Sequence, residues 1–309
     1  MTTFEILLQQ IGLFVIYILA GVILVRTKVL NRETLEPISK FVIKMALPVM
    51  ILINIIDGVN KEILTGSWSI LLIAAGFYAV MFLVSFGMTK FFRLSEDRAG
   101  ICQAMMLFGN IGFMAVPVIS SVFPGNGILY VSVFMVFDQL MLWTLGVKLT
   151  TLPGSGGFEL KKLVNPATVA ILIGMILMLT EVRIPSLFDT GLQKIGATAS
   201  PLAMIYIGGI FAELPLKKYL KELSLYGIVL VRMLLAPLLM FLVLGFFPVN
   251  EEIRLAMALI TGMPTMTAVV MMANASGMDG DYALGGVFIT TLCGIVTLPC
   301  ICWLLQYVI

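Results

Sequence analysis

The sequence predicts an all-α integral membrane protein of ten transmembrane helices, built as two inverted repeats of five helices each. Three observations support this fold class. Hydrophobic residues make up 60% of the chain and charged residues only 12%, whereas soluble domains average about 25% charged residues. Apolar stretches of about 20 residues, long enough to cross a bilayer, can be drawn ten times. Two of them, the fourth and the ninth, are interrupted near the middle by glycine and proline.

The ten apolar stretches follow one another with mostly short connections. The N-terminus lacks the basic segment of a signal peptide, because Arg26 and Lys28 follow the first apolar run instead of preceding it. We therefore interpret the first stretch as a retained span. The predicted spans cover, in order, residues 4–25, 36–56, 68–90, 98–122, 127–149, 165–180, 191–212, 222–247, 252–276 and 281–307.

One long predicted loop divides the chain. It contains the segment Pro153-Gly-Ser-Gly-Gly157, whose composition is typical of a flexible linker. We expect a first repeat over residues 1–150, a cytoplasmic linker over 151–164 and a second repeat over 165–309. Because each half holds an odd number of spans, the second half is inverted relative to the first.

The order of small features along the two halves agrees with an inverted repeat. Pro48 in span two corresponds to Pro201 in span seven, and spans four and nine share the glycine–proline break. The loop charges then predict the orientation, since cytoplasmic loops carry the excess of Lys and Arg. The first, third, fifth and seventh loops are each rich in basic residues, whereas the alternate loops and their borders hold only Lys61, Arg183, Lys194 and Arg254. Both termini are therefore expected outside the cell.

Spans four and nine carry the segments Gly109-Asn-Ile-Gly-Phe-Met-Ala-Val-Pro117 and Ile260-Thr-Gly-Met-Pro-Thr-Met-Thr-Ala268. Proline removes a backbone donor and glycine weakens a helix. In hydrocarbon, such breaks are tolerated only where they are buried in protein or line a cavity. Paired broken spans at corresponding places indicate the binding site of a secondary transporter. The alternative is two proline-kinked structural helices.

A carboxylate could bind where the half-helices of spans four and nine meet. The first N–H groups of a helix lack partners and the dipole is positive there, so two N-termini at Asn110–Gly112 and Pro264–Thr267 could hold an anion without an arginine. Alternatively, Asn110 only satisfies freed backbone groups. The candidate substrate-binding residues are Gly109, Asn110, Ile111, Gly112, Pro117, Lys44, Asp138, Pro264, Thr265 and Thr267.

Charged residues inside spans are costly and are therefore candidates for function. Asp138 lies about 11 residues past Gly127, or roughly 16 Å deep at helical rise. It is the coupling candidate, as a proton acceptor or cation ligand, or else one member of a buried ion pair. Lys44 could contact a carboxylate, pair with Asp138, or extend to the cytoplasmic surface. Arg232 is placed near the cytoplasmic side, where snorkelling or scaffold pairing is favoured, and Gln139 is equally compatible with joining helices.

The composition also excludes several functions. Without histidine, His-based catalysis and the HExxH zinc motif are impossible. The four cysteines lie within predicted spans without metal-ligand spacing. The formal net charge of +2 gives no indication of nucleic-acid binding. We expect neither an enzyme nor a cofactor or metal site.

Several segments resemble the auxin efflux carrier family, which includes the plant PIN-formed auxin carriers. The likeness extends over essentially the whole chain and rests on Gly109–Pro117, Asn165-Pro166 with Ile173-Gly174, Arg232–Pro237, Met263-Pro-Thr265 with Thr290-Thr291, and Leu298-Pro299. The resemblance implies an elevator-type carrier with a scaffold and a mobile transport domain, often a homodimer. It also implies that Asn110 is a substrate ligand and that Lys44 lies next to the substrate site. The chain lacks the long hydrophilic loop of the plant carriers, which favours a bacterial inner-membrane protein.

The sequence hypothesis is a secondary active or potential-driven transporter of a small organic anion, such as malate, malonate or an auxin-like acid. A membrane potential that is negative inside favours anion export by about 2.3 kcal/mol per charge per 100 mV, so import would require a proton, sodium or an exchanged anion. The alternative is a sodium/proton-type ion transporter, or a sodium-coupled organic-anion symporter, of the same architecture. The neighbours of Asp138, Phe137 and Gln139, argue against the acid pair that antiporters use.

Overall fold

The computed structural model describes residues 3–58, 68–151, 166–182, 184–213 and 219–308. These residues are helical apart from turns and one isolated β-bridge. The predicted linker lies outside the described residues except for Thr151. The protein is an all-helical membrane protein, and seven of the described helices are long and apolar enough to span a bilayer.

The helices of the first half follow the predicted spans closely. Span four is not one continuous helix, because it is divided between α6 and the unit η2–α7. The elements are α1 (Thr3–Arg26), α2 (Arg32–Phe41), η1 (Val42–Ala46), α3 (Leu47–Gly58), α5 (Trp68–Phe91), α6 (Glu96–Leu107), η2 (Ile111–Ala115), α7 (Val116–Val122), α8 (Gly127–Met141), η3 (Leu142–Gly146) and α9 (Val147–Leu149).

The second half repeats this order, with span nine divided between α16 and α17. The elements are α10 (Pro166–Thr180), α11 (Ser186–Ala197), α12 (Ala199–Glu213), α14 (Leu223–Ile228), η5 (Val229–Leu235), α15 (Ala236–Leu244), α16 (Glu251–Thr261), α17 (Ala268–Ala275) and α18 (Gly280–Val308). The helix α10 is apolar but short, as predicted for span six.

Proline explains three of the π-helical turns. The turns η1, η2 and η5 end two residues before Pro48, Pro117 and Pro237. A proline ring clashes with the carbonyl four residues earlier and offers no N–H to it, so the preceding turn widens. Such turns are frequent at functional sites, and η2 lies directly after the break in span four.

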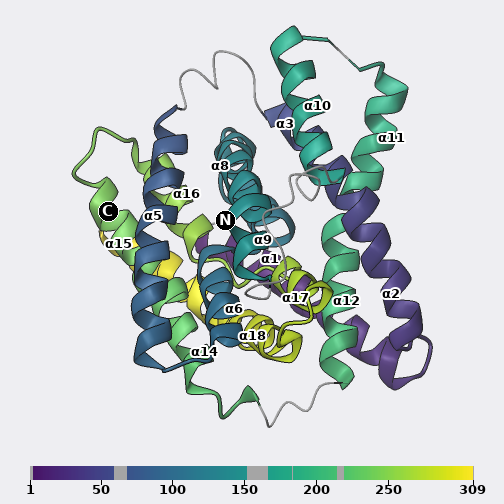
Figure 1. The fold of residues 1–309 in the computed structure, drawn as a ribbon. Helices are drawn as coiled ribbons and strands as arrows, with labels where there is room; N and C mark the ends of the chain where they lie inside the picture. The colour runs from purple at the N-terminus through teal and green to yellow at the C-terminus, as the bar shows by residue number, and fades with distance from the viewer. Residues whose placement is uncertain (1–2, 59–67, 152–165, 183, 214–218, 309) are drawn as a thin grey trace.

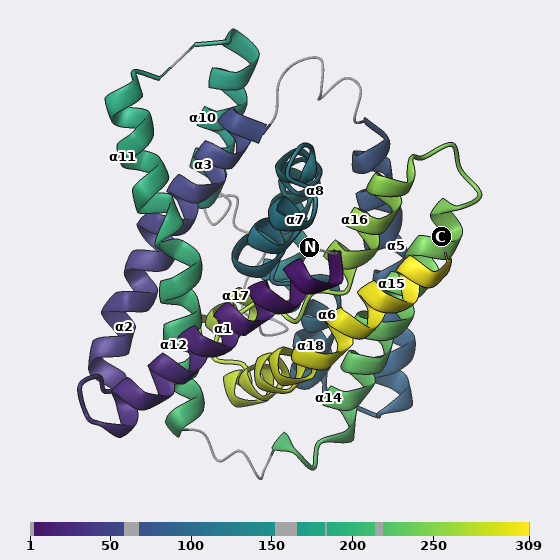
Figure 2. The same cartoon turned by 180° about the vertical axis from the view of Figure 1, so that it is seen from behind.

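The helices pack in two groups. One consists of α1, α2–η1–α3, α10 and α11–α12, and the other of α5 to α9 together with α14 to α18. Figure 1 shows α2, α3, α10, α11 and α12 on one side of the molecule and α5, α14, α15 and α16 on the other. Seen from behind in Figure 2, α1 crosses from the first group towards α18. The groups meet where α3 contacts α8, where α1 contacts α7 and α18, and where α12 contacts η2.

Glycines allow the closest contact within the first group. A Cβ on Gly21 of α1 would overlap the carbonyl of Ile205 on α12, and a Cβ on Gly208 would overlap that of Ile18. Small residues permit such backbone approach between membrane helices. Gly208 is therefore used for packing within the chain.

Polar contacts between loops agree with the predicted alternation of loops across the membrane. Arg98, beside the third loop, donates to Asp279 of the ninth loop at 2.8 Å and lies 3.4 Å from Glu222 of the seventh. On the opposite side, Asn126 of the fourth loop donates to Glu252 beside the eighth at 3.3 Å. Loops predicted to share a side thus contact each other. Which side faces the cytoplasm stays a prediction.

Candidate functional site

The two broken spans cross at their breaks. Gly109 and Thr265 form an antiparallel β-bridge. The N–H of Asn110 donates to the carbonyl of Pro264 at 2.7 Å, and the N–H of Met266 donates to the carbonyl of Phe108 at 3.0 Å. Each break therefore satisfies backbone groups freed by the other, as burial in an apolar protein interior requires.

Thr265 holds the crossing to its neighbours. Its N–H donates to Oγ1 of Thr290 on α18 at 3.1 Å, and its hydroxyl donates to the carbonyl of Met105 on α6 at 3.2 Å. The side chain is fully buried. Because its hydroxyl hydrogen is already used, Thr265 is suited to supporting the crossing.

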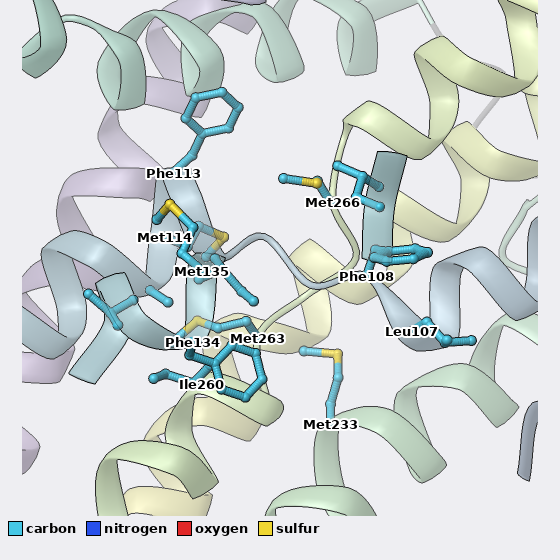
Figure 3. Close-up of a cluster of buried hydrophobic side chains, with 14 of the residues drawn as sticks. Leu107, Phe108, Phe113, Met114, Phe134, Met135, Met233, Ile260, Met263 and Met266 are labelled. Carbon is cyan, nitrogen blue, oxygen red and sulfur yellow. The ribbon is translucent and has the colours of Figure 1, made fainter. Parts of the chain in front are cut away.

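Apolar side chains enclose the crossing, and many of them are methionine. Figure 3 shows Phe108, Met263 and Met266 around the place where the two segments meet, with Met114 and Met233 nearby. All five are buried. Methionine fills irregular space and adapts to movement. The shell excludes water, so electrostatic interactions at the crossing are stronger than they would be in water.

Asn110 and Thr267 are the two unusual polar side chains of the crossing. Asn110 begins η2–α7 and Thr267 begins α17, yet neither side chain caps its helix. They are 1% and 4% exposed, and within the described part of the chain Oδ1 of Asn110 and Oγ1 of Thr267 have no hydrogen-bond partner. A buried polar group without a partner is costly. Rotation of the Asn110 amide exchanges the positions of its oxygen and its NH₂. The NH₂ of Asn110 and the hydroxyl of Thr267 can therefore both donate to a ligand.

A narrow cleft with about 10 Å³ of enclosed space reaches Thr267 from the boundary between the two groups of helices. It passes between α2–η1 and α12 on one side and η2 and α17 on the other. That space is about the size of one water molecule, so the cleft would have to widen to admit a substrate. The lining residues are Ser39, Val42, Ile43, Phe113, Ala203, Tyr206, Thr267 and Met271.

The contact of η2 with the first group is tight. A Cβ on Gly112 would lie 3.3 Å from Cδ1 of Leu47. The hydroxyl of Ser200 on α12 donates to the carbonyl of Phe113 at 2.6 Å. This carbonyl lies four residues before Pro117 and therefore lacks its helical donor. Pro117 thus creates an acceptor that the opposite group of helices uses.

Arg232 is at the crossing, which corrects the expectation that it lies near the cytoplasmic side. It is 1% exposed. Its Nε donates to the carbonyl of Met263 at 2.9 Å, and Nη1 donates to the carbonyl of Met106. The span begins at Leu223, so Arg232 lies about 14 Å along it at 1.5 Å per residue. That depth is too great for its guanidinium to reach the surface.

Asp138 is fully buried in α8. Its carboxylate accepts from the hydroxyl of Tyr78 on α5 and from Nε2 of Gln139 at 3.0 Å. It also interacts electrostatically with Arg232. The predicted alternative of a pair with Lys44 is wrong, because Lys44 is exposed on η1 while Asp138 is enclosed by these other groups.

The sequence did not indicate the contributions of Tyr78 and Ser200. Tyr78 is fully buried in an apolar helix without any motif around it. Ser200 had one signal, because it directly precedes Pro201, whose correspondence with Pro48 indicated a special place in span seven. Pro48 follows the π-helical turn η1, which ends two residues earlier at Ala46.

Comparison with known proteins identifies the family. The model of a family described as membrane transport proteins matches the chain twice, over residues 6–157 and again over 155–302. The chain belongs to this family, the auxin efflux carrier family of membrane transporters. The double match of one family model agrees with an internal repeat. This is a family of transporters and not of enzymes.

Two relatives are similar to this chain over most of their length. An "Uncharacterized transporter" of Methanothermobacter thermautotrophicus is 24% identical over 92% of this chain and 93% of that protein. A protein of Rhizobium meliloti named "Putative malonate transporter" is 22% identical over 89% of this chain and 88% of that protein.

Proposed function

We propose that this membrane transporter carries a small organic anion, a mono- or dicarboxylate, which binds where the two broken spans cross. One observation carries the proposal. Asn110 and Thr267 lie at the starts of two half-helices, are buried, and keep side-chain oxygens without partners among the residues that the structure describes. An anion can accept from the Thr267 hydroxyl and from the NH₂ of Asn110 once its amide is rotated, and the helix N-termini favour a negative charge.

The mechanism we propose is alternating access of the elevator type. The first group of helices serves as the scaffold, and the second, which contains the crossing, moves across it with the substrate. The cleft that ends at Thr267 lies on the boundary between the groups, where such movement would open and close access. We place the protein in a bacterial cytoplasmic membrane with both termini outside, and a homodimer built on the scaffold is part of this proposal.

Malonate is the first substrate to test, because one relative bears that name. Malate belongs to the same chemical class. Transport would be secondary active, with a coupled proton or sodium ion, or driven by the potential alone.

The deciding experiment is a thermal-shift screen of the purified protein against malonate, malate, succinate, lactate and indole-3-acetate, with and without sodium. A bound ligand raises the melting temperature by mass action. We expect one of the carboxylates to stabilise the wild type and to have little effect on Asn110→Ala. Equal stabilisation of both proteins would contradict binding at the crossing.

The buried carboxyl of Asp138 favours one alternative, a sodium/proton-type transporter or a sodium-coupled symporter. Its contacts argue against a simple cation site, since Tyr78 and Gln139 already donate to it. In the described part of the chain, no three acidic or sulfur ligands gather in one place. If sodium alone stabilises the protein through Asp138 and no anion does, this alternative replaces the anion carrier.

A further inference from the structure

Arg232 connects the two broken spans at the crossing, because its side chain donates hydrogen bonds to both. One guanidinium donates to the carbonyl of Met106, near the end of α6, and to the carbonyl of Met263, just past the end of α16. Both carbonyls lie at helix C-termini, where acceptors are unpaired and the dipole is negative. A planar fork with several donors can serve two acceptors at once, which an ammonium group cannot do with the same geometry.

The guanidinium also lies directly against the bridge between the spans. A Cβ on Gly109 would overlap Nη2 of Arg232, and Gly109 is the residue that pairs with Thr265. Glycine is therefore required for the charge to approach this closely. The guanidinium lies against Gly109, and Asn110 is the next residue along the chain. The positive charge is therefore next to the proposed anion site.

Asp138 is the acidic group that can compensate this charge. No direct ion pair joins Asp138 to Arg232, but a short path of contacts does. Tyr78 donates to Asp138 and packs its ring against Phe108, and the guanidinium lies against the next residue, Gly109. Among the described residues, the titratable groups that face Asp138 are Tyr78 of α5 and Arg232 of η5. The surroundings are otherwise uncharged, with the rings of Phe108, Phe134 and Phe137 packed around Tyr78.

We infer that Arg232 supplies the positive charge of the anion site and that protonation of Asp138 switches that charge on, which makes the proton the coupling ion. With Asp138 ionised, the two side chains sum to zero charge. When a proton adds to the carboxylate, the pair carries one positive charge, and a bound anion restores neutrality in a water-free site where charges interact strongly. Each anion is then transported with a proton and moves one fewer negative charge across the membrane.

This inference rests on the proposed function, because it assigns the charge and the coupling ion of the same site. The test measures the affinity of purified wild type and Asp138→Asn for malonate and malate from pH 5 to pH 8. The titration of the ligand is the same for both proteins and cancels in the ratio of their affinities. We expect the ratio of the affinity of Asp138→Asn to that of the wild type to rise about tenfold towards pH 8, as Asp138 ionises in the wild type only.

Two further variants separate charge from structure. Arg232→Gln should bind at least tenfold more weakly and should lose the dependence on Asp138, so that the double variant with Asp138→Asn behaves like Arg232→Gln alone. Arg254→Gln is the matched control, because Arg254 also donates to a carbonyl, that of Phe241, but away from the crossing.

Tyr78→Phe tests the same switch without changing a charge. It removes a donor to the carboxylate, so the pH at which affinity falls should move upwards.

The outcomes are distinguishable. A ratio that stays constant between pH 5 and pH 8 overturns the coupling while leaving the anion carrier intact. An Arg232→Gln variant that retains wild-type affinity overturns the role of its charge. If neither malonate nor malate binds the wild type at any pH, the proposed function fails and this inference fails with it.

Discussion

The N–H of Asn110 donates to the carbonyl of Pro264 at 2.7 Å, which links the two broken spans directly. Neither segment is helical at this place, and each supplies what the other lacks. The hydrogen bond uses only the main chain, so the Asn110 side chain is not required for it. The main chain of Asn110 therefore stabilises the crossing, while its side chain stays available to bind a substrate.

Thr265 and Thr267 allow a matched comparison. The hydroxyl of Thr265 donates to the carbonyl of Met105, whereas the hydroxyl of Thr267 has no partner among the residues that the structure describes. Thr265→Val should lower stability by about 1–3 kcal/mol, because it leaves a buried acceptor unpaired. Thr267→Val should leave stability unchanged or raise it, but should weaken anion binding about tenfold or more, because a hydrogen bond to a charged ligand is lost. Thermal melts with and without malonate measure both effects, and identical behaviour of the two variants would contradict the assignment.

Ser200 connects the two groups of helices through the carbonyl that Pro117 frees. Ser200→Ala should destabilise this arrangement by about 0.5–1.5 kcal/mol and should alter the rate of transport, because the contact must break if one group moves against the other. Ser120→Ala on α7 is the control, since the Ser120 hydroxyl has no partner in the described part of the chain. Melting temperature and uptake into proteoliposomes are the measurements. An unchanged rate in Ser200→Ala would show that the contact does not limit movement.

Seven of the ten predicted spans are helices long and apolar enough to cross a bilayer, and they were predictable because the signal for a span is local. Twenty apolar residues and their flanking charges suffice. The helix α5 begins at the predicted residue and ends one residue later than predicted. The breaks were also local, since glycine and proline act on the backbone where they occur. Family membership was recognisable for the same reason, because the segments that carry it surround these breaks.

The partners of the intramembrane charges could not be predicted, because they depend on which helices meet. Tyr78 lies 60 positions before Asp138, and Met106 lies 126 positions before Arg232. No periodicity relates such distant residues. The depth of Arg232 was mistaken for a second reason. Long cationic side chains usually reach the surface from near a span's end, and only the carbonyls of the crossing explain why this one does not.

Gly109 can be tested as the residue that admits the guanidinium. A Cβ there would overlap Nη2 of Arg232, so Gly109→Ala should force the charge or the bridge to move. Overpacking in a dense interior costs about 1–3 kcal/mol, and we expect a lower melting temperature together with lost anion binding. Gly87→Ala in α5 is the control, because nothing lies within 4 Å of its added Cβ. A Gly109→Ala variant that melts and binds like the wild type would contradict the described approach of Arg232.

The orientation of the chain can be tested with single cysteines in exposed loops. Asn126 is exposed beside Glu252, and Lys221 is exposed beside Glu222, which contacts Arg98 on the opposite side of the molecule. In a variant whose native cysteines are replaced by alanine, a membrane-impermeant maleimide should label Asn126→Cys in intact cells. Lys221→Cys should react only after permeabilisation, because its loop is rich in lysine and such loops stay inside. The reverse pattern would place both termini in the cytoplasm.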